Sequence, residues 1–202
     1  VEGPTRGLLT AERTALNLLG HLSGVATATS QWADAIASTN AQVRDTRKTT
    51  PGMRALEKYA VRCGGGVNHR MSLSDAALVK DNHIVAAGGV AQAFAAVRKA
   101  APSIVLEIEV DTIDQLRTAL TAGADLVLLD NMKPEVLREA VAIAAQHLAA
   151  TGRAVVLEAS GGLTLENAQS VAATGVNYIS VGALTHSAKV LDIGLDLETI
   201  VA

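Results

Sequence analysis

Aromatic residues and cysteines are both scarce in this chain. Phe, Trp and Tyr make up 2% of the 202 residues, although 49% are hydrophobic. The core must therefore be built from Ala, Val, Leu and Ile, a composition typical of parallel sheets covered by helices. The single cysteine, Cys63, excludes an internal disulfide framework and suits a reducing compartment. We expect Cys63 to be an ordinary small, buried hydrophobe.

Long apolar runs and an excess of basic charge are also missing. No run approaches the roughly 20 residues of a membrane span, and no signal-peptide pattern opens the chain. We therefore expect a cytoplasmic protein without a membrane partner. A formal charge of -3, with few aromatic rings for base stacking, argues against a nucleic-acid partner. The length is sufficient for one large core, so we expect one domain, with an appendage at most.

Charge is unevenly distributed along the sequence. The stretch "RDTRKTTPGMRALEK" at 44–58 contains five cations, and residues 44–80 carry a net charge of +5. Residues 107–130 reverse this balance, with six acids against Arg117 alone. A fold that joined the two windows would form a pocket with a cationic wall and an acidic wall. Such a pocket suits a phosphorylated substrate carried with a divalent metal.

Short apolar runs alternate with helical patterns, which predicts parallel strands joined by right-handed crossovers. The predicted strands cover 41–46, 76–83, 104–110, 125–131, 154–162 and 177–183. The predicted helices cover 51–64, 88–100, 112–123, 133–152 and 165–175, and several end at glycine. Before them, Thr10 is the expected N-cap of one long helix or two abutting helices over 11–38.

Charged or small residues stand at the carboxyl end of nearly every predicted apolar run. They are Arg47, Lys48, Lys80, Glu109, Asp130, Ser160, Gly161, Gly162 and Gly182. A closed barrel gathers all of its strand ends around one mouth, whereas an open sheet gathers only those beside a switch point. We therefore predict an α/β fold: an incomplete, six- or seven-stranded TIM-like barrel preceded by a long helix.

The residues at this mouth have several possible roles. Glycines in "EASGGLTLENA" and "ISVGALTH" are either ordinary loop residues or let main-chain N–H groups approach a phosphate. Lys80 is a phosphate contact or a Schiff-base nucleophile. Glu109 and Asp130 suit ribose hydroxyls, the water shell of a metal, or acid–base roles. Among the histidines, His69 and His83 are site candidates, whereas we interpret three others as structural: His21, His147 and His186.

The segment "RDTRKTTPGMRALEKYAVRCGGGVNHRMSLSDAALVKDNHI", with "EIEV", "LLDNM", "EASGGL" and "ISVGALTHS", resembles the quinolinate phosphoribosyltransferase family. The resemblance extends from about Glu12 to Asp196. It implies a decarboxylating pentosyltransferase of NAD synthesis, which converts quinolinate and phosphoribosyl pyrophosphate, with Mg²⁺, to nicotinate mononucleotide, pyrophosphate and carbon dioxide. It also implies a roughly seven-stranded barrel that works as a homodimer or an assembly of dimers.

The resemblance implies roles for individual residues. Arg13 would reach into the site of the partner subunit. Glu109 and Asp130 would bind the ribose hydroxyls and the magnesium ion, and with Lys48 and Lys80 they form the expected catalytic set. The quinolinate carboxylates and the phosphates would contact Thr46, Arg47, Lys48, His69, Arg70 and Lys80. The 5′-phosphate would contact Ser160, Gly161, Gly162, Val181, Gly182 and Ala183.

The chain departs from the family at its start, since family members carry an N-terminal α/β sandwich domain before the helix that contains Arg13. We expect residues 1–40 to be a loop and helical region that packs on the barrel and on the dimer partner. The catalytic barrel would cover 41–190. Residues 191–202 would return toward the missing sandwich domain, and the cut would expose apolar surface and lower activity.

Three alternatives remain open. The first is a paralogous phosphoribosyltransferase of the same fold that acts on another acceptor, which substrate profiling would identify. The second is a Schiff-base aldolase that uses Lys80, which imine trapping would detect. The third is a non-catalytic module that binds a phosphosugar, which binding of phosphoribosyl pyrophosphate without turnover would indicate.

Overall fold

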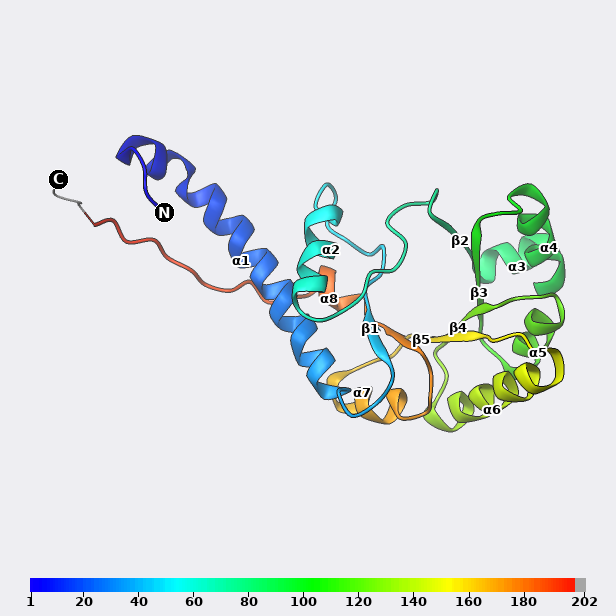
Figure 1. The fold of residues 1–202 in the computed structure, drawn as a ribbon. Helices are drawn as coiled ribbons and strands as arrows, with labels where there is room; N and C mark the ends of the chain where they lie inside the picture. The colour runs from blue at the N-terminus through cyan, green and yellow to red at the C-terminus, as the bar shows by residue number, and fades with distance from the viewer. Residues whose placement is uncertain (199–202) are drawn as a thin grey trace.

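The computed structural model describes residues 1–198, and Figure 1 shows how their elements are arranged. Within this range six parallel strands form one sheet in the order β1-β6-β5-β4-β3-β2. The strands are β1 (Gln42–Arg44), β2 (Ala76–Val79), β3 (Val105–Val110), β4 (Leu126–Asp130), β5 (Val156–Ser160) and β6 (Tyr178–Ser180). Because β1 and β2 remain the two edges, the sheet is an incomplete barrel, as the sequence predicts.

Helices follow the strands and cover the outside of the sheet (Figure 1). They are α1 (Thr5–Ala35), α2 (Arg54–Cys63), α3 (Asp81–Ala87), α4 (Val90–Ala100), α5 (Ile113–Thr121), α6 (Pro134–Thr151), α7 (Leu165–Ala172) and α8 (Ala183–His186). Local chemistry marks several of their starts. Thr112 caps α5 by accepting a hydrogen bond from the Gln115 N–H, and Thr164 caps α7 in the same way through Asn167. Within residues 1–198, no helix combines the length and apolar character needed to cross a bilayer.

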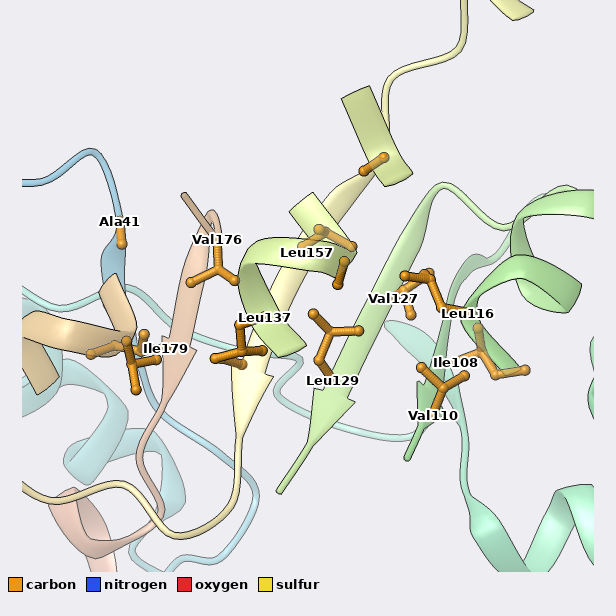
Figure 2. Packing of buried hydrophobic residues seen from close by; sticks show 14 of the residues in the cluster. Ala41, Ile108, Val110, Leu116, Val127, Leu129, Leu137, Leu157, Val176 and Ile179 are labelled. Carbon is orange, nitrogen blue, oxygen red and sulfur yellow. The ribbon is translucent and has the colours of Figure 1, made fainter. Parts of the chain in front are cut away.

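The hydrophobic core lies between the outer face of the strands and the helices. Side chains alternate between the two faces of a strand, so Ile108 of β3 and Val127 and Leu129 of β4 point outward. They pack with Leu116 of α5 and Leu137 of α6, all of them buried (Figure 2). The inward positions of the sheet are consequently free for other residues, and toward the carboxyl ends of the strands several of them are polar: Glu107 and Glu109 of β3, Asp130 of β4, and Glu158 and Ser160 of β5.

Helix α1 is a single helix of 31 residues. The expectation of a helix start at Thr10 is wrong, because α1 begins at Thr5 and the Thr10 hydroxyl donates to the Arg6 carbonyl within the helix. Half of α1 projects from the barrel, and the C-terminal segment runs alongside it (Figure 1). There the Leu191 N–H donates to the Gly20 carbonyl at 3.0 Å. The last part of the predicted segment 191–202, residues 199–202, lies outside the described range, and the predicted domain limits stay predictions.

The main local error of the sequence prediction lies at residues 76–83. Strand β2 ends at Val79, and Lys80 is the N-cap residue of α3, which the apolar pattern did not indicate. The Lys80 N–H donates to Nδ1 of His83, one turn into the helix, at 2.9 Å. Cys63 also departs from expectation: it is exposed at the end of α2 rather than buried.

Candidate active site

A cavity of about 630 Å³ opens at the carboxyl ends of the strands. Every strand contributes to it, either by its last residues or by the loop that follows. The cavity is lined by Thr46, Arg47, Lys48, His69, Arg70, Lys80, Glu109, Asp130, Ser160, Gly161, Gly162, Val181, Gly182 and Ala183, together with seven further residues. All of the residues that the sequence placed at the mouth are therefore brought together, apart from Arg13 and His83. Arg13 is exposed on α1, away from this cavity.

The two charged sequence windows meet in this cavity. Arg47, Lys48 and Arg70 approach from the segments after β1 and before β2, whereas Glu109 and Asp130 end the inward faces of β3 and β4. The walls touch where Lys80 Nζ lies 2.6 Å from Glu109 Oε2. Burial, followed by the neighbouring charge of Arg47, lowers the pKa of the Arg70 guanidinium.

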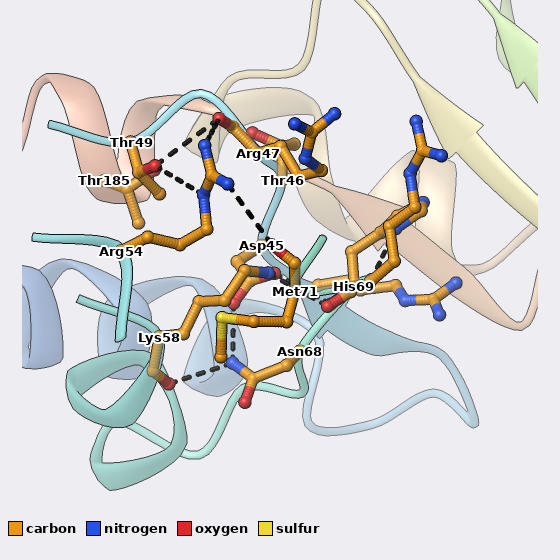
Figure 3. Close-up of polar contacts among 12 residues, drawn as sticks. Asp45, Thr46, Arg47, Thr49, Arg54, Lys58, Asn68, His69, Met71 and Thr185 are labelled. Carbon is orange, nitrogen blue, oxygen red and sulfur yellow. Dashed lines mark hydrogen bonds and ion pairs between the residues drawn. The ribbon is translucent and has the colours of Figure 1, made fainter. Parts of the chain in front are cut away.

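Most of the crowded cations at 44–58 serve the protein itself. Lys58 is fully buried and forms an ion pair with Asp45, which also accepts from the Asn68 amide at 2.6 Å and from the His69 N–H at 2.7 Å (Figure 3). Desolvation by burial lowers the pKa of Lys58. Asp45 therefore ties the loop after β1 to the loop before β2, and both loops carry cavity cations.

Arg54 braces the same loops from the start of α2. Its guanidinium donates to Thr49 Oγ1 at 2.9 Å, to the Arg47 carbonyl at 3.4 Å and to the Met71 carbonyl at 3.3 Å (Figure 3). Thr185 adds a bond to the Lys48 carbonyl at 2.7 Å. The main chain of Arg47 and Lys48 is thus held from behind, and their side chains are the two from this cationic stretch that line the cavity.

The acidic wall is supported by Asn131, a residue that the sequence reasoning did not single out although it stands in "LLDNM". Its Nδ2 donates to Asp130 Oδ2 at 2.6 Å, and its N–H donates to the Ser160 carbonyl at 2.8 Å. Desolvation raises the pKa of Asp130, while this hydrogen bond opposes the rise. Gly161 has φ 82°, and a Cβ there would collide with the Asn131 side chain, so this turn requires glycine.

Two histidines differ from their interpretation by sequence. His186, which the sequence analysis interpreted as structural, lines the cavity beside Gly182. The two residues are four positions apart in "ISVGALTHS", so this spacing could have indicated that His186 belongs to the site. His83, a site candidate, instead lines a neighbouring cavity of about 690 Å³ between β2 and α4. Arg47, Arg70 and Lys80 border both cavities.

Residues 25–196 match the family described as quinolinate phosphoribosyl transferase, C-terminal domain. Over 98% of its length the chain is 56% identical to the nicotinate-nucleotide pyrophosphorylase (carboxylating) of Mycobacterium leprae, of which it covers 68%. The chain belongs to the quinolinate phosphoribosyltransferase family. The human nicotinate-nucleotide pyrophosphorylase (carboxylating) is 44% identical over 98% of the chain, which covers 66% of the human protein.

Solved structures of the quinolinate phosphoribosyltransferase family share this fold. The nicotinate-nucleotide pyrophosphorylase of Francisella tularensis matches 93% of the chain with a TM-score of 0.86 and 46% identity. That of Ehrlichia chaffeensis matches 95% with a TM-score of 0.87 and 42% identity. The chain covers 65% and 67% of these two proteins, so it spans about two thirds of the length of its relatives.

The acidic wall of this quinolinate phosphoribosyltransferase domain fits a magnesium ion. Glu109 uses Oε2 for Lys80 and Asp130 uses Oδ2 for Asn131, so each carboxylate keeps one oxygen that no hydrogen bond within residues 1–198 engages. Mg²⁺ prefers oxygen ligands and commonly takes one or two carboxylates, with water and substrate phosphates completing its shell. Glu109 and Asp130 are therefore suitable ligands at the open side of the cavity.

Proposed function

We propose that this chain is the catalytic barrel of a quinolinate phosphoribosyltransferase of de novo NAD biosynthesis. It transfers the phosphoribosyl group of phosphoribosyl pyrophosphate to quinolinate and releases pyrophosphate and carbon dioxide, leaving nicotinate mononucleotide. The observation that carries the proposal is a single cavity in which a cationic wall, two carboxylates and glycine turns meet. The names of the relatives, nicotinate-nucleotide pyrophosphorylase (carboxylating), agree with it.

The two walls suit opposite ends of the transition state. Departure of pyrophosphate from C1 leaves positive charge on the ribose ring and places negative charge on the leaving group. Glu109 and Asp130 stabilise the ribose cation, and Lys48 and Lys80 stabilise the departing pyrophosphate. The main-chain N–H groups of the turns at Gly161 and Gly182 take the 5′-phosphate.

The acceptor is oriented by arginine. The guanidinium groups of Arg47 and Arg70 bind the two quinolinate carboxylates, so that the pyridine nitrogen faces C1. Attack by the nitrogen forms the N–C1 bond, breaks the C1–O bond to pyrophosphate and makes the ring a pyridinium. The electron pair of the ring–carboxylate bond then passes to the ring carbon as carbon dioxide leaves, and that carbon takes up a proton.

Glu109 and Asp130 would also hold magnesium in this site. When bound, the ion neutralises phosphate charge on the donor. The protein residues position both substrates around it. We also propose a cytoplasmic homodimer, in which Arg13 of one subunit completes the cationic wall of the other, because Arg13 does not line the cavity of its own chain.

Release of labelled carbon dioxide from carboxyl-labelled quinolinate tests this function. The assay is run with and without phosphoribosyl pyrophosphate and magnesium, on the 202-residue chain and on a longer version with the additional domain of its relatives. We expect release that requires the donor. A signal from the longer version alone would show that the additional domain helps to form the site. No release from either length would overturn the proposal and favour another acceptor.

Lys80 is expected to act through its charge. Its ammonium forms an ion pair with Glu109, whereas an imine would require a free amine. Lys80→Ala should lower the affinity for substrates or the turnover. Borohydride added with substrate should leave no covalent adduct on the wild-type protein, and an adduct at Lys80 detected by mass spectrometry would contradict this role.

A further inference from the structure

A cluster of charged side chains lies inside the barrel, one layer below the acidic wall. We call it the floor cluster: Arg44 of β1, His69, Glu107 of β3 and Glu158 of β5. Glu107 is 1% exposed and Glu158 is fully buried. Branched apolar residues usually fill the interior of such barrels, and burying charge is costly unless it is paired. The floor cluster therefore needs an explanation beyond filling space.

Both ring nitrogens of His69 are used within the protein. The Arg70 main-chain N lies 2.7 Å from Nδ1, and because an N–H can only donate, Nδ1 must be the acceptor. Nε2 then carries the ring proton and lies 2.9 Å from Glu107 Oε2 and 3.6 Å from Glu158 Oε1. This arrangement defines the Nε2–H tautomer, with Nδ1 engaged by the main chain and Nε2 beside the two carboxylates.

Glu158 is anchored by its own partners. The Arg44 guanidinium and the Ser180 hydroxyl both bind its carboxylate, and Arg44 also stacks 4.6 Å from the centre of the Tyr178 ring. His69, Glu107 and Glu158 offer ligand atoms within 4.8 Å of one another. Arg44 already supplies a cation there, however, so the floor cluster does not call for a metal ion.

Two members of the floor cluster, His69 and Glu158, line the cavity, and the cluster is linked to the cationic wall through Arg70. The His69 ring holds the Arg70 main chain, and Arg70 Nη1 donates to the Ala76 carbonyl of β2 at 2.7 Å. The His69 main chain is itself fixed, since its N–H donates to Asp45 and its carbonyl accepts from Lys58 Nζ at 2.9 Å. The direction of the Arg70 guanidinium thus depends on the His69 ring, because this ring holds the Arg70 main chain and the His69 main chain is itself held by Asp45 and Lys58.

We propose that His69 is a positioning residue for the acceptor. Through Nδ1 it fixes the main chain of Arg70, and so the guanidinium that binds one quinolinate carboxylate. Glu107 and Glu158, the latter anchored by Arg44, hold the ring in the required tautomer. The proposal rests on the proposed function, because it assigns Arg70 to the acceptor rather than to the phosphoribosyl donor.

Two substitutions of His69 separate the roles of its nitrogens. In His69→Asn the side-chain oxygen can replace Nδ1 as acceptor for the Arg70 N–H, whereas in His69→Gln the longer side chain places its amide near Nε2 and leaves that N–H without its partner. Loss of one such bond corresponds to about tenfold in affinity. We expect His69→Gln to raise the KM for quinolinate about tenfold, with the KM for phosphoribosyl pyrophosphate and kcat changed by less than about twofold.

His69→Asn should keep the KM for quinolinate within about threefold of wild type. Glu107→Gln, which keeps an acceptor for the Nε2–H, should also be near wild type, whereas Glu107→Leu should resemble His69→Gln. Equal changes in the KM values of both substrates, or a His69→Asn variant as impaired as His69→Gln, would overturn the positioning role. These KM and kcat values are measured with whichever of the two proteins, the 202-residue chain or the longer version, releases carbon dioxide in the assay above.

A measurement on the free protein is independent of activity. Nitrogen-15 NMR of the His69 ring should give the Nε2–H tautomer at neutral pH, and an Nδ1–H tautomer or an imidazolium would contradict the proposal. If wild type releases no carbon dioxide while NMR gives the expected tautomer, the proposed function fails and the assignment of Arg70 to the acceptor fails with it. If wild type is active and the two KM values change together, the positioning role alone fails.

Discussion

At the scale of single residues, buried charges hold the loops that carry the site. Lys58 and Asp45 are both fully buried, and Asp45 also binds the His69 N–H. Lys58→Met leaves the Asp45 carboxylate buried without its cation, and breaking such a pair costs about 3–5 kcal/mol. We expect a loss of that size in the free energy of unfolding, measured by urea titration. The double variant Asp45→Asn with Lys58→Met should be more stable than Lys58→Met alone, and an equally unstable double variant would refute the pairing.

Glu158 should make stability depend on pH. Desolvation, and then the Glu107 carboxylate, raise its pKa above the glutamate value in the unfolded chain, about 4.3. Protonation of Glu158 therefore favours the folded state: its contribution is complete below the unfolded pKa and is lost as pH rises through the folded pKa. Glu158→Gln cannot ionise but keeps an oxygen for Arg44.

Urea titrations of wild type and Glu158→Gln between about pH 5 and pH 8 measure this contribution. The free energy of unfolding of wild type, relative to the variant, should fall as the pH rises. A relative stability that is constant or increases with pH would show that Glu158 is not harder to ionise in the folded protein.

At the scale of elements, the contact between α1 and α2 depends on a glycine. A Cβ at Gly64 would collide with the Ala26 carbonyl of α1 and approach the Thr29 Cβ to 2.7 Å. Gly64→Ala should therefore lower the free energy of unfolding by about 1–3 kcal/mol, as overpacking does. Gly7→Ala in α1, where no atom lies within 4 Å, is the matched control and should stabilise by about 0.5–1 kcal/mol. Equal effects of the two changes in urea titration would contradict a tight crossing.

At the scale of the whole molecule, the proposed dimer makes a prediction about mixed subunits. Each single variant, Arg13→Ala or Lys48→Ala, should be nearly inactive by itself when it is made in the protein length that is active in the carbon dioxide assay. Mixed and allowed to exchange subunits, they should recover about a quarter of wild-type activity, because half of the dimers are mixed and each mixed dimer has one intact site. No recovery after demonstrated subunit exchange would place Arg13 outside the partner's site.

Local features of the sequence were sufficient to predict most of the barrel and its mouth. Strand alternation, glycines after helices and polar residues after apolar runs are signals within a few residues, and they located all six strands. They did not separate β2 from α3, because the apolar run of β2 passes directly into the helix: Lys80 follows the last strand residue and is also the N-cap of α3, and His83 lies in its first turn. Asn131 was missed because its role appears only when Gly161, 30 residues later in the chain, lies beside it, whereas the spacing between Gly182 and His186 was a local signal that was overlooked.

The sequence by itself determined that cations, acids and glycine turns would meet at one barrel mouth, because parallel strands carry whatever follows them to the same edge. Only the tertiary structure decided which cations face the cavity. Arg44 points into the barrel, where it forms an ion pair with Glu158, 114 residues away along the chain. Lys58 forms an ion pair with Asp45. Arg44 and Lys58 are therefore engaged by carboxylates of the protein itself, and no short sequence pattern encodes these pairings.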